Sequence, residues 1–374
     1  MAGRRNVALL PTILGMVLTD RVLMGPGPCN PYPEATAAFC RPMLGHLDPE
    51  FISVLDETID RLRLVWQTAN PLTLPVSGTG SAGMEAAFVN TVGPGDVAVI
   101  GVNGLFGERM CDVARRCGAQ VVRVDAAWGT PLDPQSLLDA HPAPKLIALV
   151  HAETSTGVEN DVASVAEGKR DALVLADCVT SLGGIPVDID GWGVDVAYSG
   201  TQKCLGVSPG LSPFTMNERA RQRRVKTPQS WYLDLGMIGD YTAGATRKYH
   251  HTAPIAMIFS LHAGLGALLD EGLEAAWERH GTCGRALQDG LEDLGLKLWA
   301  TEGHRLPELT TVLVPDGVDD AAVRRSLLTQ YGIEIGGGVG EWAGRVWRIG
   351  CMGNTARMAN VTLLLGALAK ILGR

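Results

Sequence analysis

Six short apolar runs alternate with amphipathic segments between residues 70 and 215, and few folds accommodate such an alternation. The runs are rich in β-branched and aliphatic side chains, and they span 72–76, 97–100, 121–124, 146–150, 172–176 and 194–198. Strands that are apolar on both faces and are separated by helical intervals form a parallel sheet covered by helices on both sides. The sequence therefore predicts an α/β domain built on such a sheet.

The pattern changes near residue 256, where a long helical stretch begins. We expect helices over 257–280, 286–294 and 321–331, and strands over 310–314, 333–335 and 346–349. A last helix carries one apolar stripe at spacings of three and four, made of Met358, Val361, Leu365, Leu368 and Leu372. We therefore divide the chain into an N-terminal arm (1–24), a large domain (25–255) and a small C-terminal α+β domain (256–374).

Composition and charge exclude several classes of protein. The 374-residue chain is 46% hydrophobic and 19% charged, which excludes a disordered or fibrous protein. Its net charge of −8, without a long basic run, argues against nucleic acid as a partner. The eight cysteines occur singly and without zinc-ligand spacing, so we expect no metal site and a reducing, cytoplasmic location.

The apolar run at 7–18 is the one stretch that resembles a targeting signal. It is interrupted by Pro11, is too short to span a bilayer and lacks a small-x-small cleavage site. We therefore interpret it as part of the N-terminal arm and expect no association with a membrane.

Glycine-rich and polar segments follow most of the apolar runs. They are 77–83, 103–107, 151–157, Asp177 and 199–203. In an open parallel sheet, ligands bind in the crevice outside the carboxyl ends of the strands. We therefore expect a phosphate-binding loop, an aromatic ring, a buried acid and a lysine at one edge of the sheet.

The loop Gly78-x-Gly80-x-x-Gly83 matches the dinucleotide fingerprint. That fingerprint also needs an acid about 20 residues further on, and residues 102–104 contain no carboxylate. This absence disfavours an NAD-dependent oxidoreductase, which we keep as an alternative beside a purely structural glycine turn. In either functional case, backbone N–H groups and the helix dipole favour a phosphate near Thr79, Gly80 and Ser81.

Lys203 and Asp177 point to a particular cofactor. A lysine in partly desolvated surroundings at a sheet edge loses proton affinity and becomes a nucleophile, although it could instead be an ordinary solvated lysine. Asp177 ends an apolar run, where an unpaired charge is costly, so it needs a cationic partner unless it only caps a turn. A protonated pyridine nitrogen would serve, and with the phosphate loop and Phe106 as a stacking ring the set specifies pyridoxal phosphate.

Arg348 stands in the strand-like segment 346–349, between apolar residues. Its planar fork can bind a carboxylate through two parallel hydrogen bonds, which suits a substrate that carries an α-carboxylate. A structural salt bridge to Glu334 or Glu341 is the alternative.

Nine short motifs distributed along the chain support a family resemblance. They include the Gly-Pro-Gly-Pro at 25–28 and the Tyr-Ser-Gly-Thr-Gln-Lys at 198–203, with further motifs at 45–51, 67–74, 77–80, 103–107, 177–184, 249–254 and 348–350. On these motifs the chain resembles, nearly end to end, the class V, fold type I aminotransferases of the alanine–glyoxylate and serine–glyoxylate (serine–pyruvate) group. The resemblance implies a large domain with a mostly parallel sheet of the seven-stranded type.

The resemblance also implies residue roles. Lys203 would form the Schiff base with pyridoxal phosphate, Asp177 would pair with the ring nitrogen, and Val179 and Phe106 would pack on the two ring faces, Phe106 standing where the family often has Trp. The implied phosphate ligands are Thr79, Gly80, Ser81 and Gln202; Thr154 would lie near the ring hydroxyl, and Arg348 would bind the substrate carboxylate. Ser81 replaces a histidine of some members, and we expect little consequence because backbone N–H groups do that work.

Tyr249 and Thr252 match residues that reach the phosphate of the neighbouring subunit. The resemblance therefore implies a homodimer with shared active sites. The implied reaction moves an amino group from a small amino acid, alanine or serine, to a keto acid, glyoxylate or pyruvate, with ping-pong kinetics. Alternatives within the fold are a ureidoglycine-type or phosphonate-type aminotransferase and a lyase; a non-catalytic binding module is a further one.

Overall fold

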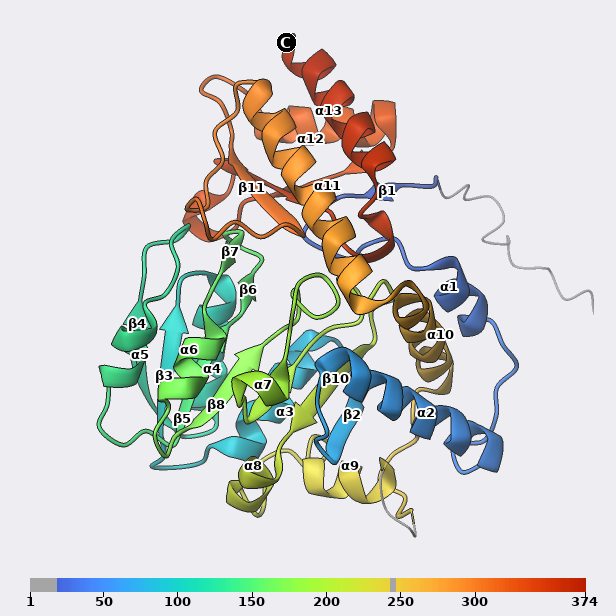
Figure 1. The fold of residues 1–374 in the computed structure, drawn as a ribbon, viewed down its shortest axis with the longest axis vertical. Coiled ribbons are helices and arrows are strands. Elements are labelled where there is room, and N and C mark those ends of the chain that lie inside the picture. The colour runs from blue at the N-terminus through green and yellow to red at the C-terminus, as the bar shows by residue number, and fades with distance from the viewer. Residues whose placement is uncertain (1–18, 243–246) are drawn as a thin grey trace, which may run out of the picture.

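The computed structural model describes residues 19–242 and 247–374 (Figure 1). The apolar run at 7–18, interpreted above as part of an N-terminal arm, lies outside the described residues. Two layers of helices enclose a central sheet in the larger part of the molecule, and a smaller part with its own sheet lies at the other end (Figure 1).

The central sheet has seven strands in the order β2-β10-β9-β8-β5-β3-β4. They are β2 (Leu72–Ser77), β3 (Val97–Val102), β4 (Gln120–Asp125), β5 (Leu146–Val150), β8 (Leu173–Asp177), β9 (Val196–Tyr198) and β10 (Leu211–Met216). All pairs are parallel except those of β10, which is antiparallel to both neighbours. This confirms the predicted α/β class with a mostly parallel sheet.

Neighbouring residues of the inner strands contribute to two different cores. Val99 packs in one core, whereas Ala98 and Ile100 pack in the other, because successive side chains of a strand point to opposite faces. Strand β4 departs from the prediction: it lies at the edge of the sheet, and its residues Gln120 and Asp125 are exposed.

Helices cover both faces of the sheet. One face carries α1 (Pro33–Phe39), α2 (Pro49–Trp66), α5 (Pro134–Asp139), α6 (Val162–Gly168), α7 (Ile189–Trp192) and α10 (Ile255–Glu271). The other carries α3 (Gly80–Thr91), α4 (Leu105–Arg116), α8 (Glu218–Arg223) and α9 (Leu235–Thr242). Helices α3 and α4 begin directly after β2 and β3, so their amino termini lie at the carboxyl edge of the sheet.

The smaller part contains two long helices and a three-stranded sheet of order β11-β14-β13. Its elements are α11 (Leu273–Asp293), β11 (Leu309–Leu313), α12 (Asp320–Ser326), a π-helical turn (Leu327–Tyr331), β12 (Ile333–Glu334), β13 (Gly336–Gly337), β14 (Val346–Gly350) and α13 (Met358–Leu372). Strand β1 (Val22–Leu23) pairs with β12, and a further pair, β6 (Ala152–Glu153) with β7 (Val158–Glu159), forms a small hairpin.

One helix prediction for this part is wrong, and another is confirmed except at its first residue. The helical stretch breaks at Gly272 rather than between 280 and 286, because Gly272 adopts a φ of +89° there and α10 and α11 meet at 84°. On α13, four residues of the predicted stripe belong to the core of the small part or pack against it, namely Val361, Leu365, Leu368 and Leu372. Met358 is 45% exposed, and Leu364, outside the predicted stripe, is fully buried.

The division at 255/256 stays a prediction about independent domains. Helix α10 packs on α1 and α2 in the core of the large part. Met24, the last residue of the predicted arm, belongs to the core of the small part. In the described part of the chain no single helix has the length and apolar composition to cross a bilayer; α10 and α11 meet that test only as a bent pair.

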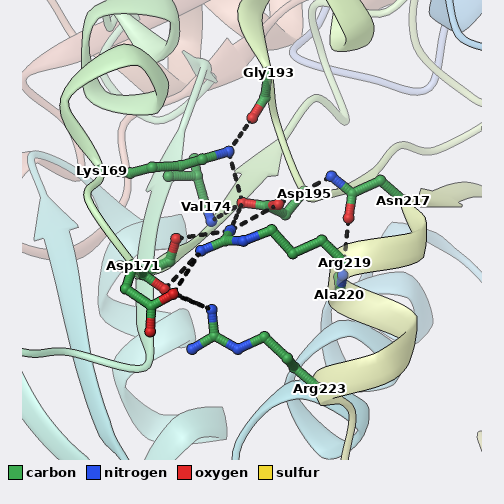
Figure 2. A network of polar contacts seen from close by, with 10 residues as sticks. Lys169, Asp171, Val174, Gly193, Asp195, Asn217, Arg219, Ala220 and Arg223 are labelled. Carbon is green, nitrogen blue, oxygen red and sulfur yellow. Dashed lines mark hydrogen bonds and ion pairs between the residues drawn. The ribbon is translucent and has the colours of Figure 1, made fainter.

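A buried ion network fixes β8 and β9 at the edge of the sheet opposite the predicted site (Figure 2). The fully buried Asp195 accepts bonds from Lys169 at 2.9 Å, Arg219 at 3.0 Å and Asn217 at 2.9 Å. Burial raises the pKa of Asp195, but the bonds from Lys169, Asn217 and the Val174 N–H together with the charge of Lys169 hold it below its ordinary value. The network stabilises the register that sets Asp177 beside Tyr198 at the far end of these strands.

His280, on α11, is hydrogen-bonded to the segment at Gly353, which packs against the backbone of Lys203. Its Nδ1 donates to the Ala276 carbonyl at 2.7 Å and its Nε2 accepts from the Gly353 N–H at 2.9 Å, and an added Cβ at Gly353 would lie 3.1 Å from the Lys203 carbonyl oxygen. Both ring nitrogens are thus used by the neutral form. Burial lowers the pKa of His280 to about 4.

This burial predicts a pH-dependent stability. Below about pH 6.5 the unfolded chain takes up a proton at residue 280 that the folded chain refuses. The contribution of His280 is therefore complete above pH 6.5 and is lost as the pH falls toward 4, which amounts to about 2 kcal/mol of unfolding free energy between pH 7 and pH 5. Urea unfolding at both pH values measures it; His280→Gln should remove this part of the pH dependence, and an unchanged slope would contradict the assignment.

Candidate active site

A cavity of about 270 Å³ opens at the carboxyl edge of the central sheet. It contains eight of the residues predicted from the sequence, namely Thr79, Gly80, Ser81, Phe106, Asp177, Val179, Gln202 and Lys203. Gly27, Pro28, Met84, Arg109 and Pro209 complete its lining. A larger hollow of about 950 Å³ lies between α1, α2 and α10, but no predicted site residue lines it.

Lys203 follows β9 and is only 7% exposed. Its Nζ donates to the carbonyl of Pro26, so the 25–28 turn covers the amine. Gly27 has a φ of +112°, and an added Cβ would lie 2.7 Å from Lys203 Cδ, so the close approach requires glycine. Burial lowers the pKa of Lys203 to about 8, and the positive charge of Arg348 acts in the same direction. The amine is thus partly neutral near pH 8, and it is not a solvated loop lysine.

Asp177 ends β8 beside Tyr198, its direct partner on β9. The Tyr198 hydroxyl donates to Oδ2 at 2.7 Å and the Val179 N–H donates to Oδ1 at 2.9 Å. The bond to Val179 is the turn cap considered as an alternative, so the carboxylate caps a turn and lines the cavity as well. Burial raises the pKa of Asp177 to about 6, against the lowering effect of both bonds, so the group is mostly ionised at neutral pH.

The first turn of α3 contains the residues of the predicted phosphate-binding loop. Thr79 is the N-cap and makes no side-chain cap bond, so the N–H groups at Gly80 and Ser81 are available to a ligand. An added Cβ at Gly80 would lie 2.8 Å from Val179 Cγ2, so a larger residue at position 80 would clash with Val179 on the cavity wall. Gln202 Oε1 is buried without a hydrogen-bond partner in the described chain, and a buried amide needs one. The free N–H donors fit an anionic ligand; the Gln202 oxygen is an acceptor, so this side chain could meet an anion only through its Nε2 group.

Glu153 holds the start of α4, which carries Phe106. It is fully buried; its Oε2 accepts from the Phe106 N–H at 3.2 Å, and its Oε1 accepts from the Ser155 hydroxyl at 2.6 Å. The same hydroxyl accepts from the Leu105 N–H at 2.9 Å. Burial raises the pKa of Glu153, while the bonds from Ser155 lower it. The helix dipole also favours a carboxylate at a helix amino terminus. Here the bond that the Phe106 N–H donates to Glu153 fixes the position of the Phe106 backbone, and with it the place from which the ring extends.

Arg348 lies on β14, outside the residues that line the cavity. Its Nε donates to the Gly337 carbonyl at 2.7 Å, and its Nη1 lies 3.5 Å from the Thr154 carbonyl oxygen. These contacts replace the considered salt bridges to Glu334 and Glu341. Thr154 is buried but does not line the cavity either, so its predicted place near a ring hydroxyl stays a prediction.

Tyr249 and Thr252 are not among the residues that line the cavity of their own chain. Tyr249 is 58% exposed, and its hydroxyl lies 3.4 Å from Thr252 Oγ1. The two side chains therefore form an exposed polar pair that a neighbouring subunit could meet.

Sequence reasoning missed four groups around the cavity: Pro26, Arg109, Glu153 and Tyr198. Tyr198 could have been predicted, because it and Asp177 each end one of two consecutive apolar runs, and parallel pairing of the two strands places their ends side by side. Arg109 follows Phe106 by three residues, which places both on one helix face, but the motif drew attention only to the ring. Within the described ranges, no group of three or more His, Cys, Asp or Glu side chains is placed to hold a metal ion.

Comparison with known proteins agrees with this geometry. The family model for aminotransferase class-V matches residues 30–344. The chain is 36% identical to the (S)-ureidoglycine–glyoxylate transaminase of Bacillus subtilis, over 95% of this chain and 91% of that protein. It is 38% identical to the alanine–glyoxylate aminotransferase of Drosophila melanogaster, over 94% and 92% of the two chains. The crystal structure of alanine–glyoxylate aminotransferase from Nostoc sp. matches with a TM-score of 0.94 and 47% identity, over 100% of both chains.

Proposed function

Because the chain belongs to the class-V aminotransferases, we propose that it uses pyridoxal phosphate to move an amino group from alanine or serine to glyoxylate or pyruvate. The observation that carries the proposal is the pairing of a buried lysine with a buried, oriented carboxylate on one cavity. The alanine–glyoxylate aminotransferases among its relatives support the choice of substrates.

The residues of the cavity fit the cofactor. Pyridoxal phosphate, when bound, supplies an aldehyde that takes up amino groups and a ring that withdraws electrons from the α-carbon of the substrate. The first turn of α3 and Gln202 would hold the phosphate, and Phe106 and Val179 would cover the ring. Asp177, oriented by Tyr198 and Val179, would keep a proton on the ring nitrogen.

Lys203 would move the proton at the α-carbon of the substrate. A general base works best when its pKa lies near the working pH, and burial brings the Lys203 amine into that range. The neutral amine can accept the proton, and the resulting ammonium can return it during the second half of the reaction. The charge of Asp177 favours the protonated form, and the ammonium can donate to the Pro26 carbonyl.

Arg348 would hold the α-carboxylate of the substrate. Arg348→Lys keeps the positive charge but loses the planar fork, so we expect the KM for the amino donor to rise about tenfold or more with a smaller change in kcat. Steady-state kinetics with alanine measure the split. The exposed Arg345, three residues earlier, gives the matched control Arg345→Lys; a fall in kcat alone would contradict the assignment.

A second substrate class has specific support, since a relative at 36% identity is a (S)-ureidoglycine–glyoxylate transaminase. The test of the function is a single-turnover screen in which the loaded enzyme is mixed with alanine, serine, ureidoglycine or a phosphonate amine, and the change in cofactor absorbance is followed. Fast conversion by alanine or serine supports the proposal. Conversion by ureidoglycine alone would replace the donor, and no conversion by any amine would refute aminotransfer.

We further propose a homodimer in which Tyr249 and Thr252 of one subunit reach the phosphate site of the other. Their exposure outside their own cavity supports this arrangement. We also propose a cytoplasmic location, which is supported by eight cysteines that are all free thiols.

A further inference from the structure

Arg109 lies on the cavity, one helical turn after Phe106 on α4. Its guanidinium carbon Cζ lies 4.8 Å from the centre of the Phe106 ring, within the range of a cation–π contact. Its Nη1 donates to the Ser81 hydroxyl at 3.2 Å, and Ser81 belongs to the first turn of α3. The side chain therefore bridges the stacking ring and the phosphate-binding loop.

The charges around the cavity show what this bridge contributes. The expected phosphate ligands Thr79, Gly80, Ser81 and Gln202 are all uncharged, whereas a phosphate monoester carries about −1.5 to −2 at neutral pH. Among the lining residues of the described chain, Lys203 and Arg109 are the two bases, and Lys203 is directed to the Pro26 carbonyl.

Arg109 has no acid to neutralise it in its contacts, since the Ser81 hydroxyl and the Phe106 ring carry no charge. Its field nevertheless reaches the cavity: after burial and the bonds from Tyr198 and Val179, the positive charges of Lys203 and Arg109 lower the pKa of Asp177. Arg109 is thus a positioned cation without a counter-ion, and it lies beside free N–H groups and the positive end of a helix. Such a set of groups is a binding site for an anion, which the ligand would supply.

We propose that Arg109 is a cofactor-binding residue that supplies the positive charge of the phosphate site, and that Phe106 and Ser81 hold its guanidinium in place. This inference rests on the proposed function, because it takes pyridoxal phosphate as the ligand. It also changes the expectation for Ser81: the serine side chain is more than a substitute for the histidine of some relatives, since its hydroxyl fixes Arg109.

Three variants separate charge from stacking. Arg109→Gln keeps a planar donor but removes the charge, Arg109→Lys keeps the charge but removes the planar group, and Ser81→Ala keeps the backbone N–H while it removes the acceptor. Arg115→Gln, an exposed position on the same helix, is the matched control. Each apoenzyme is titrated with pyridoxal phosphate and with pyridoxal, which lacks the phosphate, and binding is read from cofactor absorbance and protein fluorescence.

We expect Arg109→Gln to weaken the binding of pyridoxal phosphate about tenfold to a hundredfold and to leave pyridoxal within about twofold, because a charge-assisted bond is lost only for the phosphate. Arg109→Lys should keep most of the affinity, and the affinity of the wild type should depend more steeply on salt than that of Arg109→Gln. Ser81→Ala should fall between the two.

Equal losses for both ligands in Arg109→Gln would overturn the inference, because they would show that the residue acts only through the Phe106 ring. An unchanged affinity for pyridoxal phosphate would overturn it as well. If Arg109→Gln does not fold, Arg109→Lys is compared with the wild type. A loss of affinity in Arg109→Lys that is as large for pyridoxal as for pyridoxal phosphate would refute the role of charge. If the wild type itself binds neither compound, the proposed function fails, which is a distinguishable result.

Discussion

Lys203→Ala is expected to lower turnover by roughly 10⁴-fold, because it removes both the amine that binds the cofactor and the base that moves the α-proton. Borohydride reduction of the loaded wild type should add the cofactor mass to the peptide that contains residue 203, and the variant should lack that product. Because the lysine is buried, thermal melting of Lys203→Ala must show that the variant is still folded.

Lys203→Arg is the matched variant, because arginine keeps the positive charge but does not lose its proton near neutral pH. It should be as inactive as Lys203→Ala. A small primary amine added to Lys203→Ala should restore part of the proton transfer, whereas it cannot enter the filled space in Lys203→Arg. Turnover of a few per cent or more in either variant without added amine would contradict the role of the lysine.

Asp177→Asn is expected to lower kcat by about 10²-fold to 10⁴-fold with a modest change in KM, because a neutral amide cannot hold the ring nitrogen in its protonated form. The Asn side chain is almost the same shape, and its oxygen can still accept the Val179 N–H. Rapid-mixing absorbance should show slow amino-group release from bound alanine while cofactor loading still occurs.

The titration of Asp177 adds a pH signature. The carboxylate of the cofactor-free protein is present above about pH 6 and is lost as the pH falls through that value, so cofactor affinity should fall in the same range. Asp177→Asn should lack this dependence. Tyr198→Phe removes the bond to Oδ2 that lowers the pKa and should therefore shift the dependence to higher pH. A pH profile that is the same in all three proteins would contradict the assignment.

Strand ends were the most informative part of the sequence. Asp177 and Lys203 follow apolar runs that parallel pairing must align at one edge, so their meeting on one cavity could be predicted without coordinates. Strand β10 could not be predicted from the sequence, because Pro213 lies in its centre and proline argues against a strand. The structure tolerates it because the Ser199 N–H beside β9 still donates to the Pro213 carbonyl, and the Ser199 carbonyl accepts from the Ser212 hydroxyl in place of the N–H that Pro213 lacks.

The chain's local pattern determined the class of fold, the edge at which ligands bind and the identity of the acid and the lysine there, because alternation and strand-to-loop junctions are properties of neighbouring residues. Only the tertiary structure decided what holds these groups. Tyr198 reaches Asp177 through strand register, Pro26 covers Lys203 from a distant turn, and Arg109 meets Ser81 because two helices converge. Contacts between segments far apart in the chain depend on packing, which no local pattern encodes.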